Sequence, residues 1–279
     1  MKTTIYNFLK ILKNRFFRKY YEKILLFFNK KKFFYYENLT TKINLEIIFN
    51  DKDIEKKFLN DYEKIKRLEI PELAGGVNPG DQKAIYFLIN SLKPKKVLEI
   101  GTHIGSSTTG IALAMSNNFD LSQSYLKTVD LRDVNDENSK PWLQYNSKNS
   151  PKKNIKILGL EKLVSFKVSD SINFFYNEKE KYDFIFLDGS HRADYVYNEI
   201  SSSLKILNTN GIILLHDYFP FGKKLWDKRE AIFGPYEGVK KICNENPTIK
   251  CMPFGNLPWQ TKLNSNISSL AIIYKEKNL

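Results

Sequence analysis

Residues 97–107, VLEIGTHIGSS, decide the fold of this chain. The first four are apolar except for Glu99, and Pro94 and Gly101 bound them. A short apolar run between two structure breakers is typical of a buried strand in a parallel sheet. The segment therefore predicts a central strand of an α/β protein.

The turn after this strand contains two glycines, Gly101 and Gly105. Glycine permits a tight turn and lets the backbone come close to a ligand. Ser106 or Ser107 is expected to cap a helix over residues 107–115, whose first N–H groups are free to bind a ligand. Strand, glycine-rich turn and helix form the nucleotide-binding corner of a doubly wound sheet, although many α/β proteins use the same unit for packing alone.

The composition is that of a globular protein. The 279 residues are 42% hydrophobic and 27% charged, which allows one main domain and an appendage. The two cysteines, Cys243 and Cys251, exclude a disulfide scaffold, so a cytoplasmic location is expected. No apolar run approaches the ~20 residues of a membrane span, and the longest N-terminal run, residues 24–28, is too short for a signal-peptide core.

Positive charge is concentrated near the N-terminus. Residues 1–32 contain ten bases and one acid, Glu22, and so carry nine of the thirteen net positive charges. Apolar residues recur there every three or four positions, which predicts one or two basic amphipathic helices. This segment would contact an anionic membrane at its inner face, or pack against the protein's own core or a partner in a homodimer. Nucleic acid is not an expected partner, because no motif supports it.

The rest of the chain is expected to hold one large domain after a short connection. A helix is predicted over residues 53–67, and the glycine- and proline-rich loop 68–80 is either a linker or a lid over a ligand. Asp81 is expected to cap a helix that ends near Leu92. The predicted parts are a basic amphipathic helical extension at 1–50, a helix and loop at 51–80, and the main domain at 81–279.

A second strand is predicted over residues 126–130, and it ends in an acid, Asp130. In a nucleotide-binding sheet, an acid at this place accepts hydrogen bonds from ribose hydroxyls. Asp133 is a weaker candidate for the same role. The distance along the chain from Gly101 to Asp130 and the G-x-x-x-G turn both argue against NAD.

The remaining pattern alternates strands and helices. The polar stretch 131–155 is either a surface loop or a segment that contacts substrate. Predicted strands lie at 165–170, 182–189 and 211–217, with an antiparallel closing pair at 249–253 and 268–274; predicted helices lie at 171–179, 194–207 and 234–244, and a turn at 208–211.

The ordered motifs carry a resemblance. VLEIGTHIGSS, Asp130, VSDS, FLDGSH and GIILLHDY resemble class I S-adenosylmethionine-dependent methyltransferases, of the O-methyltransferase-like group with D-G-x-H and H-D-Y segments. The resemblance covers about residues 81–275. It implies a doubly wound, Rossmann-like, seven-stranded, mostly parallel sheet with an antiparallel last strand, here with an N-terminal helical extension. It also implies S-adenosyl-L-methionine as cofactor.

The resemblance places the cofactor along the carboxyl ends of the strands. Its methionine part would lie near Gly101 and Gly105, with Glu99 holding that turn or the cofactor's amino group, and its ribose on Asp130. Asp188 would lie beside the sulfonium. The predicted cofactor-binding residues are Glu99, Gly101, Thr102, Gly105, Ser107, Asp130, Ser169, Asp170, Ser171 and Asp188, with the three from 169 to 171 beside the adenine.

The chemistry can be reasoned without the family. A hydroxyl acceptor needs a positioned base or a cation that lowers its pKa. The three histidines, His103, His191 and His216, all fall at predicted strand ends. Either His191 or His216 is the general base beside Asp188, or Asp188 and Asp217, with or without His216, hold Mg²⁺. The alternatives are that His191 only fixes its loop and that His216 is a buried structural residue.

The sequence thus predicts methyl transfer to oxygen of a small molecule or a sugar or glycan hydroxyl. Five residues would line an acceptor pocket or simply pack in the core: Tyr218, Phe219, Trp226, Arg229 and Trp259. The rival hypotheses are a non-catalytic protein of the same fold, which docks partners or membrane through its N-terminal helices, and an oxidoreductase on a similar sheet.

Overall fold

The computed structural model describes residues 17–28, 39, 43–72, 74, 76–118, 124–227 and 229–276. The helices are α2 (Arg18–Phe28), α3 (Leu45–Phe49), α4 (Lys52–Lys66), α5 (Pro79–Leu92), α6 (Ser106–Ser116), α7 (Pro151–Ile157), α8 (Ser171–Asn177), α9 (Ala193–Ile206) and α10 (Phe233–Glu245), with 3₁₀ turns η1 (Pro141–Tyr145) and η2 (Pro220–Gly222). The strands are β1 (Lys96–Ile100), β2 (Tyr125–Asp130), β3 (Val164–Val168), β4 (Tyr182–Leu187), β5 (Leu207–Leu215), β6 (Ile249–Pro253) and β7 (Ala271–Lys275).

These strands form one seven-stranded sheet in the order β3-β2-β1-β4-β5-β7-β6. The first five strands are parallel neighbours, and β7 pairs antiparallel with both β5 and β6. The central strands β1, β4 and the second half of β5 are mostly apolar and buried because both faces of a parallel sheet are covered there, whereas β3 at the edge is largely exposed. The predicted mostly parallel sheet with an antiparallel last strand is confirmed.

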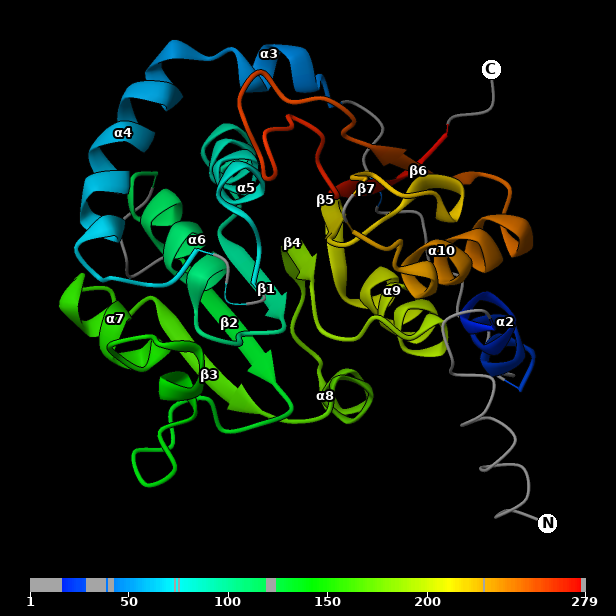
Figure 1. The fold of residues 1–279 in the computed structure, drawn as a ribbon, viewed down its shortest axis with the longest axis horizontal. Coiled ribbons are helices and arrows are strands. Elements are labelled where there is room, and N and C mark those ends of the chain that lie inside the picture. Colours follow the sequence, from blue (N-terminus) through cyan, green and yellow to red (C-terminus); the bar gives the residue numbers. More distant parts are fainter. Residues whose placement is uncertain are drawn as a thin grey trace.

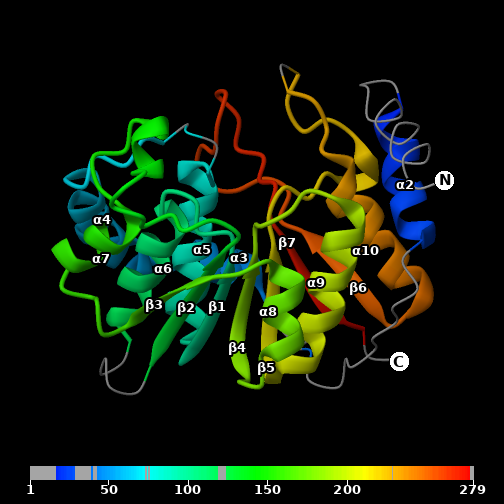
Figure 2. The same ribbon diagram turned by 90° about the horizontal axis from the view of Figure 1, so that it is seen from below.

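Helices cover the two faces of the sheet in separate layers (Figures 1 and 2). One apolar cluster joins α5 and α6 to one face, with α3 and α4 outside them. A second cluster joins α8, α9 and α10 to the other face, with α2 against α9 and α10. The order of strands reverses between β1 and β4, so ligand binding is expected where the carboxyl ends of these two strands diverge.

Two predicted helix caps are wrong. Gly105, in the left-handed conformation, precedes α6 and supplies no side-chain cap, while the hydroxyl of Ser107 points instead to Glu99. Asn78, not Asp81, caps α5, and Asp81 accepts a hydrogen bond from its side-chain amide at 2.7 Å. Pro at the start of a helix is well tolerated, which moves the start of α5 back to Pro79.

The predicted turn at residues 208–211 is also wrong. This stretch belongs to β5, which begins at Leu207 directly after α9 and shifts register against β4 between Tyr182 and Phe184. Asn210 takes a positive φ of 63° within it. Asn and Gly are common in turns, but they also mark irregularities inside strands, so composition alone could not decide between the two.

The N-terminal basic segment forms a helix where the structure describes it. In α2, Glu22 and Leu26 are buried, and Lys241 of α10 donates a hydrogen bond to the Leu26 carbonyl at 2.9 Å. Residues 1–16 and 29–32 of the predicted amphipathic segment lie outside the described residues. Among the described helices, none is long and apolar enough to cross a membrane.

The β6–β7 connection closes over the start of α5. A side chain at Gly80 would place its Cβ 2.4 Å from the Gln260 carbonyl oxygen, and the Trp259 indole donates to the Gly80 carbonyl at 2.9 Å. This close packing fixes α5, and hence Asp81, beside the carboxyl end of β5. The loops after β5 and β6 project from one edge of the sheet (Figure 2).

Candidate active site

In the turn after β1, the backbones of Gly101 and Asp188 pack closely against each other. Gly101 has a φ of 101°, and a Cβ there would lie 2.2 Å from the Asp188 carbonyl oxygen. The Gly101 N–H donates to the Val129 carbonyl at 2.8 Å, and the Asp188 N–H donates to Ile100. Glycine is the residue that fits this conformation without steric cost. The turn therefore joins the ends of β1, β2 and β4 into one rigid edge.

Glu99 lies beneath this turn rather than in the open. Its side chain is fully buried and accepts hydrogen bonds from the hydroxyls of Ser107, Thr108 and Thr128 at 2.5–2.6 Å. Burial raises the pKa of Glu99 to about 7, although these hydroxyls oppose the shift. Glu99 thus holds the turn, one of its two predicted roles, and it does not line the ligand cleft described below.

Asp130 organises the other side of the turn. Its Oδ2 accepts the His103 N–H at 2.9 Å, and its Oδ1 accepts the Arg132 N–H at 3.0 Å. His103 has a positive φ of 50°, and its ring packs against Tyr145 with centroids 4.3 Å apart. Its Nδ1 is buried without a hydrogen-bond partner among the described residues. Burial lowers the pKa of His103, and Arg132 adds to the effect, so the ring is neutral.

A cleft of about 480 Å³ runs along the carboxyl ends of β1, β2, β3 and β4. Its size is in the range of small-molecule sites. It brings together six predicted cofactor contacts from four segments of the chain: Gly101, Asp130, Ser169, Asp170, Ser171 and Asp188. Two predicted catalytic residues, Asp188 and His191, line it, as does Gly76 from the predicted linker or lid, whereas the third, His216, does not.

Four predicted cofactor contacts lie outside this cleft: Glu99, Thr102, Gly105 and Ser107. Thr102 is buried with its hydroxyl 2.6 Å from that of Thr128. A Cβ at Gly105 would lie 2.8 Å from Pro151 Cβ, so this glycine serves the packing of α6 on α7. Ser107 is committed to Glu99. These four residues support the turn after β1 through buried contacts and do not line the cleft.

His216 is a buried cation between carboxylates. Its Nδ1 lies 2.8 Å from Asp188 Oδ1, and its Nε2 lies 3.6 Å from Asp81 Oδ2. Burial lowers its pKa, but the charges of Asp188 and Asp217 outweigh burial and hold the pKa well above its usual value. Asp81 was predicted as a helix cap; the structure places it, fully buried, next to this ring.

His191 pairs with the other carboxylate. Its Nε2 lies 3.0 Å from Asp217 Oδ2, and 44% of its side chain is exposed toward the cleft side. Burial lowers the pKa of His191, but the hydrogen bond and charge of Asp217 raise it above its usual value overall. The bond at Nε2 leaves Nδ1 as the nitrogen that can exchange a proton with a ligand.

One group of side chains could hold a metal ion. One ligand atom each from Asp188, His191 and Asp217 lie within 4.8 Å of one another. The third member is thus His191, while His216 lies behind Asp188 as its hydrogen-bond partner. Two carboxylates and an imidazole suit several divalent ions, whereas Mg²⁺ favours oxygen ligands.

The cleft contains acidic and aromatic residues that sequence reasoning missed, chief among them Glu199 and Tyr195 of α9. Glu199 is 1% exposed, and Tyr195 donates to Asp170 at 3.1 Å. Asp170 also caps α8. Nothing in the local sequence distinguishes Glu199 and Tyr195 from other positions of a helix, because the packing of α9 against α8 cannot be inferred from a local pattern.

The aromatic residues predicted to line an acceptor pocket mostly pack in the core. Phe219 and Trp226 are buried together with Ala231, and Trp259 packs against Phe87 with centroids 5.0 Å apart. Lys262 places its ammonium 3.9 Å from the centre of the Trp226 ring. Lys262 is thus a half-buried cation near Asp217, and its charge helps to lower the pKa of Asp217.

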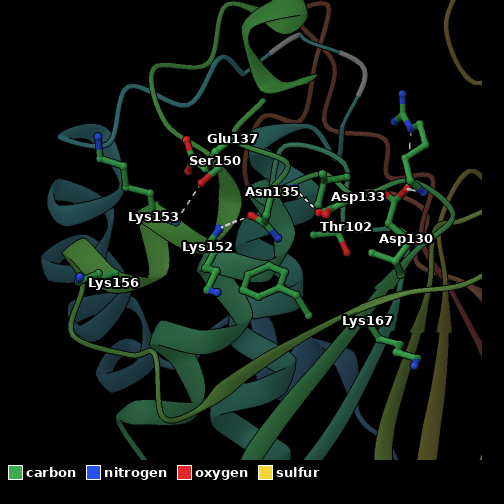
Figure 3. Close-up of a pocket in the computed structure, with 14 residues that line it drawn as sticks. Thr102, Asp130, Asp133, Asn135, Glu137, Ser150, Lys152, Lys153, Lys156 and Lys167 are labelled. Atoms are coloured by element: carbon green, nitrogen blue, oxygen red, sulfur yellow. Dashed lines mark hydrogen bonds and ion pairs between the residues drawn. The ribbon is translucent and has the colours of Figure 1, made fainter. Parts of the chain in front are cut away.

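A second cavity, of about 510 Å³, lies beside the first and shares Asp130 and Arg132 with it. The polar stretch 131–155 forms much of its wall, so this stretch borders cavities on both sides of Asp130. Figure 3 shows Lys153 and Lys156 extending away from Thr102 and Asp130. The basic residues at the rim do not converge on one point.

Comparisons with known proteins agree with this geometry. Residues 98–218 match the family model of a methyltransferase domain. A putative O-methyltransferase from Klebsiella pneumoniae is 16% identical, with a TM-score of 0.53 over 82% of this chain and 91% of that one. An O-methyltransferase from Bacillus cereus in complex with SAH is 18% identical, with a TM-score of 0.52 over 81% and 92%. TomG from Streptomyces achromogenes, in complex with SAM, is 14% identical, with a TM-score of 0.52 over 82% and 91%.

No curated protein matches the sequence. The predicted resemblance is nevertheless confirmed: residues 98–218 match a methyltransferase-domain model, and the fold is similar to those of these solved O-methyltransferases. The methyltransferase model begins at β1 and ends after β5, so it spans the strands whose ends line the cleft.

Proposed function

We propose that this protein is an S-adenosylmethionine-dependent O-methyltransferase. The observation that carries the proposal is the cleft at the ends of β1, β2 and β4, which brings the close turn at Gly101 together with one carboxylate at the end of β2, Asp130, and one at the end of β4, Asp188. Asp130 still has acceptor capacity for the ribose hydroxyls, since an ionised carboxylate offers about four lone-pair sites and the backbone uses two. The cofactor supplies a methyl group already activated on a sulfonium.

The buried polar atoms around the cleft support this fit. His103 Nδ1 lacks a partner among the described residues and lies at the turn after β1, where it can meet the amino acid end of the cofactor. Asp188 sits at the end of β4, held by the His216 cation. A fixed carboxylate there stabilises a neighbouring positive charge without having to reorganise.

His191 is the general base in this proposal. Asp217 fixes the imidazole through Nε2, and Nδ1 accepts the proton of the acceptor hydroxyl. His216 is unsuited to this role because its ring is already protonated between Asp188 and Asp81. Asp188 and His216 therefore position the donor side, while the His191–Asp217 pair serves the acceptor side.

A divalent cation on Asp188, His191 and Asp217 is the alternative mechanism. Such an ion would lower the pKa of the acceptor hydroxyl and make a separate base less important. It would also compete with the His191–Asp217 hydrogen bond for the same atoms. Activity that survives chelation favours the base; activity that is lost on chelation and restored by Mg²⁺ or Mn²⁺ favours the ion.

The acceptor is proposed to be a small molecule or a glycan hydroxyl. We further propose that α2 touches the inner face of an anionic membrane, where a membrane-linked glycan precursor would be available. Exposed aromatic residues of α2, Phe27 and Phe28 foremost, support this, as does its basic character. The rival role for the same face is contact with a second copy of the chain.

The first test is calorimetric titration of the full chain with S-adenosylhomocysteine, beside NADH, with and without Mg²⁺. We expect micromolar binding of S-adenosylhomocysteine and none of NADH. An acceptor screen with labelled methyl donor then tests turnover. Failure of S-adenosylhomocysteine to bind under every condition would overturn the proposal. A non-catalytic protein would be favoured if S-adenosylhomocysteine binds but no acceptor is methylated, and if substitutions at Asp188 and His191 give the same result as wild type.

A further inference from the structure

Glu199 is a buried carboxyl group that faces the cofactor cleft without an evident structural task. It lies in α9, is 1% exposed and lines the cleft together with Ser171 and Gly189. A Cβ at Gly189 would lie 3.5 Å from Glu199 Oε1, which places the carboxyl directly behind the end of β4. A fully buried glutamate is uncommon in proteins unless it is paired.

Only one of its two oxygens is occupied. Oε1 accepts a hydrogen bond from the Ser171 hydroxyl at 2.6 Å, and no described residue donates to Oε2. No cation forms an ion pair with it among the described residues, and Asp170 and Asp188 add negative charge nearby. Burial raises the pKa of Glu199 to about 7. Glu199 lines the cleft, so Oε2 has the capacity to accept a hydrogen bond from a ligand that fills it.

The proposed cofactor supplies a donor at this end of the cleft. Its amino acid end is assigned to the turn at Gly101 and its ribose to Asp130, so the purine extends toward residues 169–171. Ser171 belongs to that segment and is the residue bonded to Glu199. The 6-amino group of adenine is the one strong hydrogen-bond donor on the base itself.

We propose that Glu199 Oε2 accepts a hydrogen bond from the 6-amino group of the cofactor's adenine and thereby selects adenine over a 6-oxopurine. This inference rests on the proposed function. A 6-oxopurine would present a carbonyl oxygen to the carboxyl and leave both acceptors without a proton between them. Sites built around one N–H of a ligand reject analogues that lack it far more strongly than apolar pockets reject a changed methylene.

The test compares two ligands by calorimetry at pH 8: S-adenosylhomocysteine and S-inosylhomocysteine, in which a 6-oxo group replaces the 6-amino group and N1 carries a proton. Wild-type protein is expected to bind the inosyl compound about 10-fold or more weakly. Glu199→Gln should narrow this ratio toward one, because the amide can turn and offer an N–H to the 6-oxo group. The matched control is Glu237→Gln, a buried glutamate of α10 that does not line the cleft.

Equal affinity of wild-type protein for the two compounds overturns the inference, and this comparison needs no variant to fold. The inference is also overturned if Glu199→Gln and Glu237→Gln change the ratio of the two ligand affinities by the same factor. No binding of S-adenosylhomocysteine to wild-type protein would be a failure of the proposed function, and is therefore distinguishable from a failure of this assignment.

Discussion

The two histidines of the site have different tasks because their partners differ. His216 is enclosed by Asp188 and Asp81, with Asp217 Oδ1 3.8 Å from its Nδ1, whereas His191 pairs with Asp217 alone and faces the cleft. Neighbouring carboxylates favour the charged imidazole, and a second one makes this preference strong. A change at Asp217 acts most directly on His191, its partner at 3.0 Å, while His216 keeps its closer contact with Asp188.

Asp217→Asn is expected to lower kcat by about 10²–10⁴-fold, the usual contribution of a positioned base, while leaving the affinity for S-adenosylhomocysteine near that of wild type. The reason is that Asp217 orients His191 but does not line the cofactor cleft. Turnover assays and calorimetry measure the two effects. Asp227→Asn, at an exposed position of the β5–α10 loop, is the control. An equal loss of cofactor affinity would contradict this assignment.

The pH dependence follows from the same pair. Only neutral His191 can accept a proton, and Asp217 raises its pKa above the usual 6.5. We therefore expect kcat to fall as the pH drops through this raised pKa, and to level off above it. In Asp217→Asn the falling limb of the residual activity should move to lower pH, because the raising charge is gone. If activity falls at the same pH in wild type and in Asp217→Asn, the titrating group is not His191.

The sequence predicts which side chains meet at the carboxyl ends of the strands, but not the hydrogen bonds that they form there. Asp130, Asp188 and His191 could be predicted because acids and histidines at strand ends meet at one edge of a parallel sheet. The choice between the two predicted roles of Glu99 and the position of Glu199 could not, since both depend on which hydroxyl lies opposite a buried carboxyl. Such pairings are set by packing between segments far apart in the chain.

At the scale of elements, α9 is capped by a residue from another helix. Arg192 precedes α9 and makes no side-chain cap bond. Instead, Glu22 of α2 accepts the Ala193 N–H at 2.6 Å from 171 positions away, and it is 3% exposed. Burial raises the pKa of Glu22, and the bond to Ala193 opposes this shift. The N-terminal helix is thereby tied to the helix that carries Tyr195 and Glu199 into the cleft.

Glu22→Ala should lower the free energy of unfolding by about 0.5–2 kcal/mol, as loss of a helix cap does, and weaken S-adenosylhomocysteine binding through disorder at the start of α9. Thermal denaturation and calorimetry test the two effects. Glu161→Ala, at an exposed site outside the cleft, serves as control. Unchanged stability would show that the cap is replaceable by water.

The elements themselves were largely predictable. Apolar runs predicted β1, β4 and the second half of β5, because a doubly covered sheet leaves little room for polar residues. The start of β5 and the caps of α5 and α6 were missed. The cap of α5 is a local bond from the Asp81 N–H to the Asn78 side chain, whereas the hydroxyl of Ser107 is held by Glu99 of the preceding strand rather than by the start of α6.

At the scale of the whole molecule, one face of α2 is buried against the protein and the other is exposed. Glu22 and Leu26 are buried against α9 and α10, whereas Phe27 and Phe28 are 82% and 66% exposed. The net charge of the chain is +13, with most of it in residues 1–32. Exposed aromatic rings beside basic residues favour the interface of an anionic membrane.

The full chain is accordingly expected to sediment with vesicles that contain about 30% phosphatidylserine and to remain in solution with pure phosphatidylcholine. Binding should weaken as salt rises, because the Debye length shortens to about 3 Å at 1 M ionic strength. The double variant Phe27→Ser/Phe28→Ser should bind more weakly, because it removes the apolar anchor and leaves every charge in place. Tyr176→Ser, which changes an equally exposed aromatic residue on α8, should bind as wild type does. Binding that ignores lipid charge, or that both variants reduce alike, would assign the exposed face of α2 to contact with another copy of the chain instead.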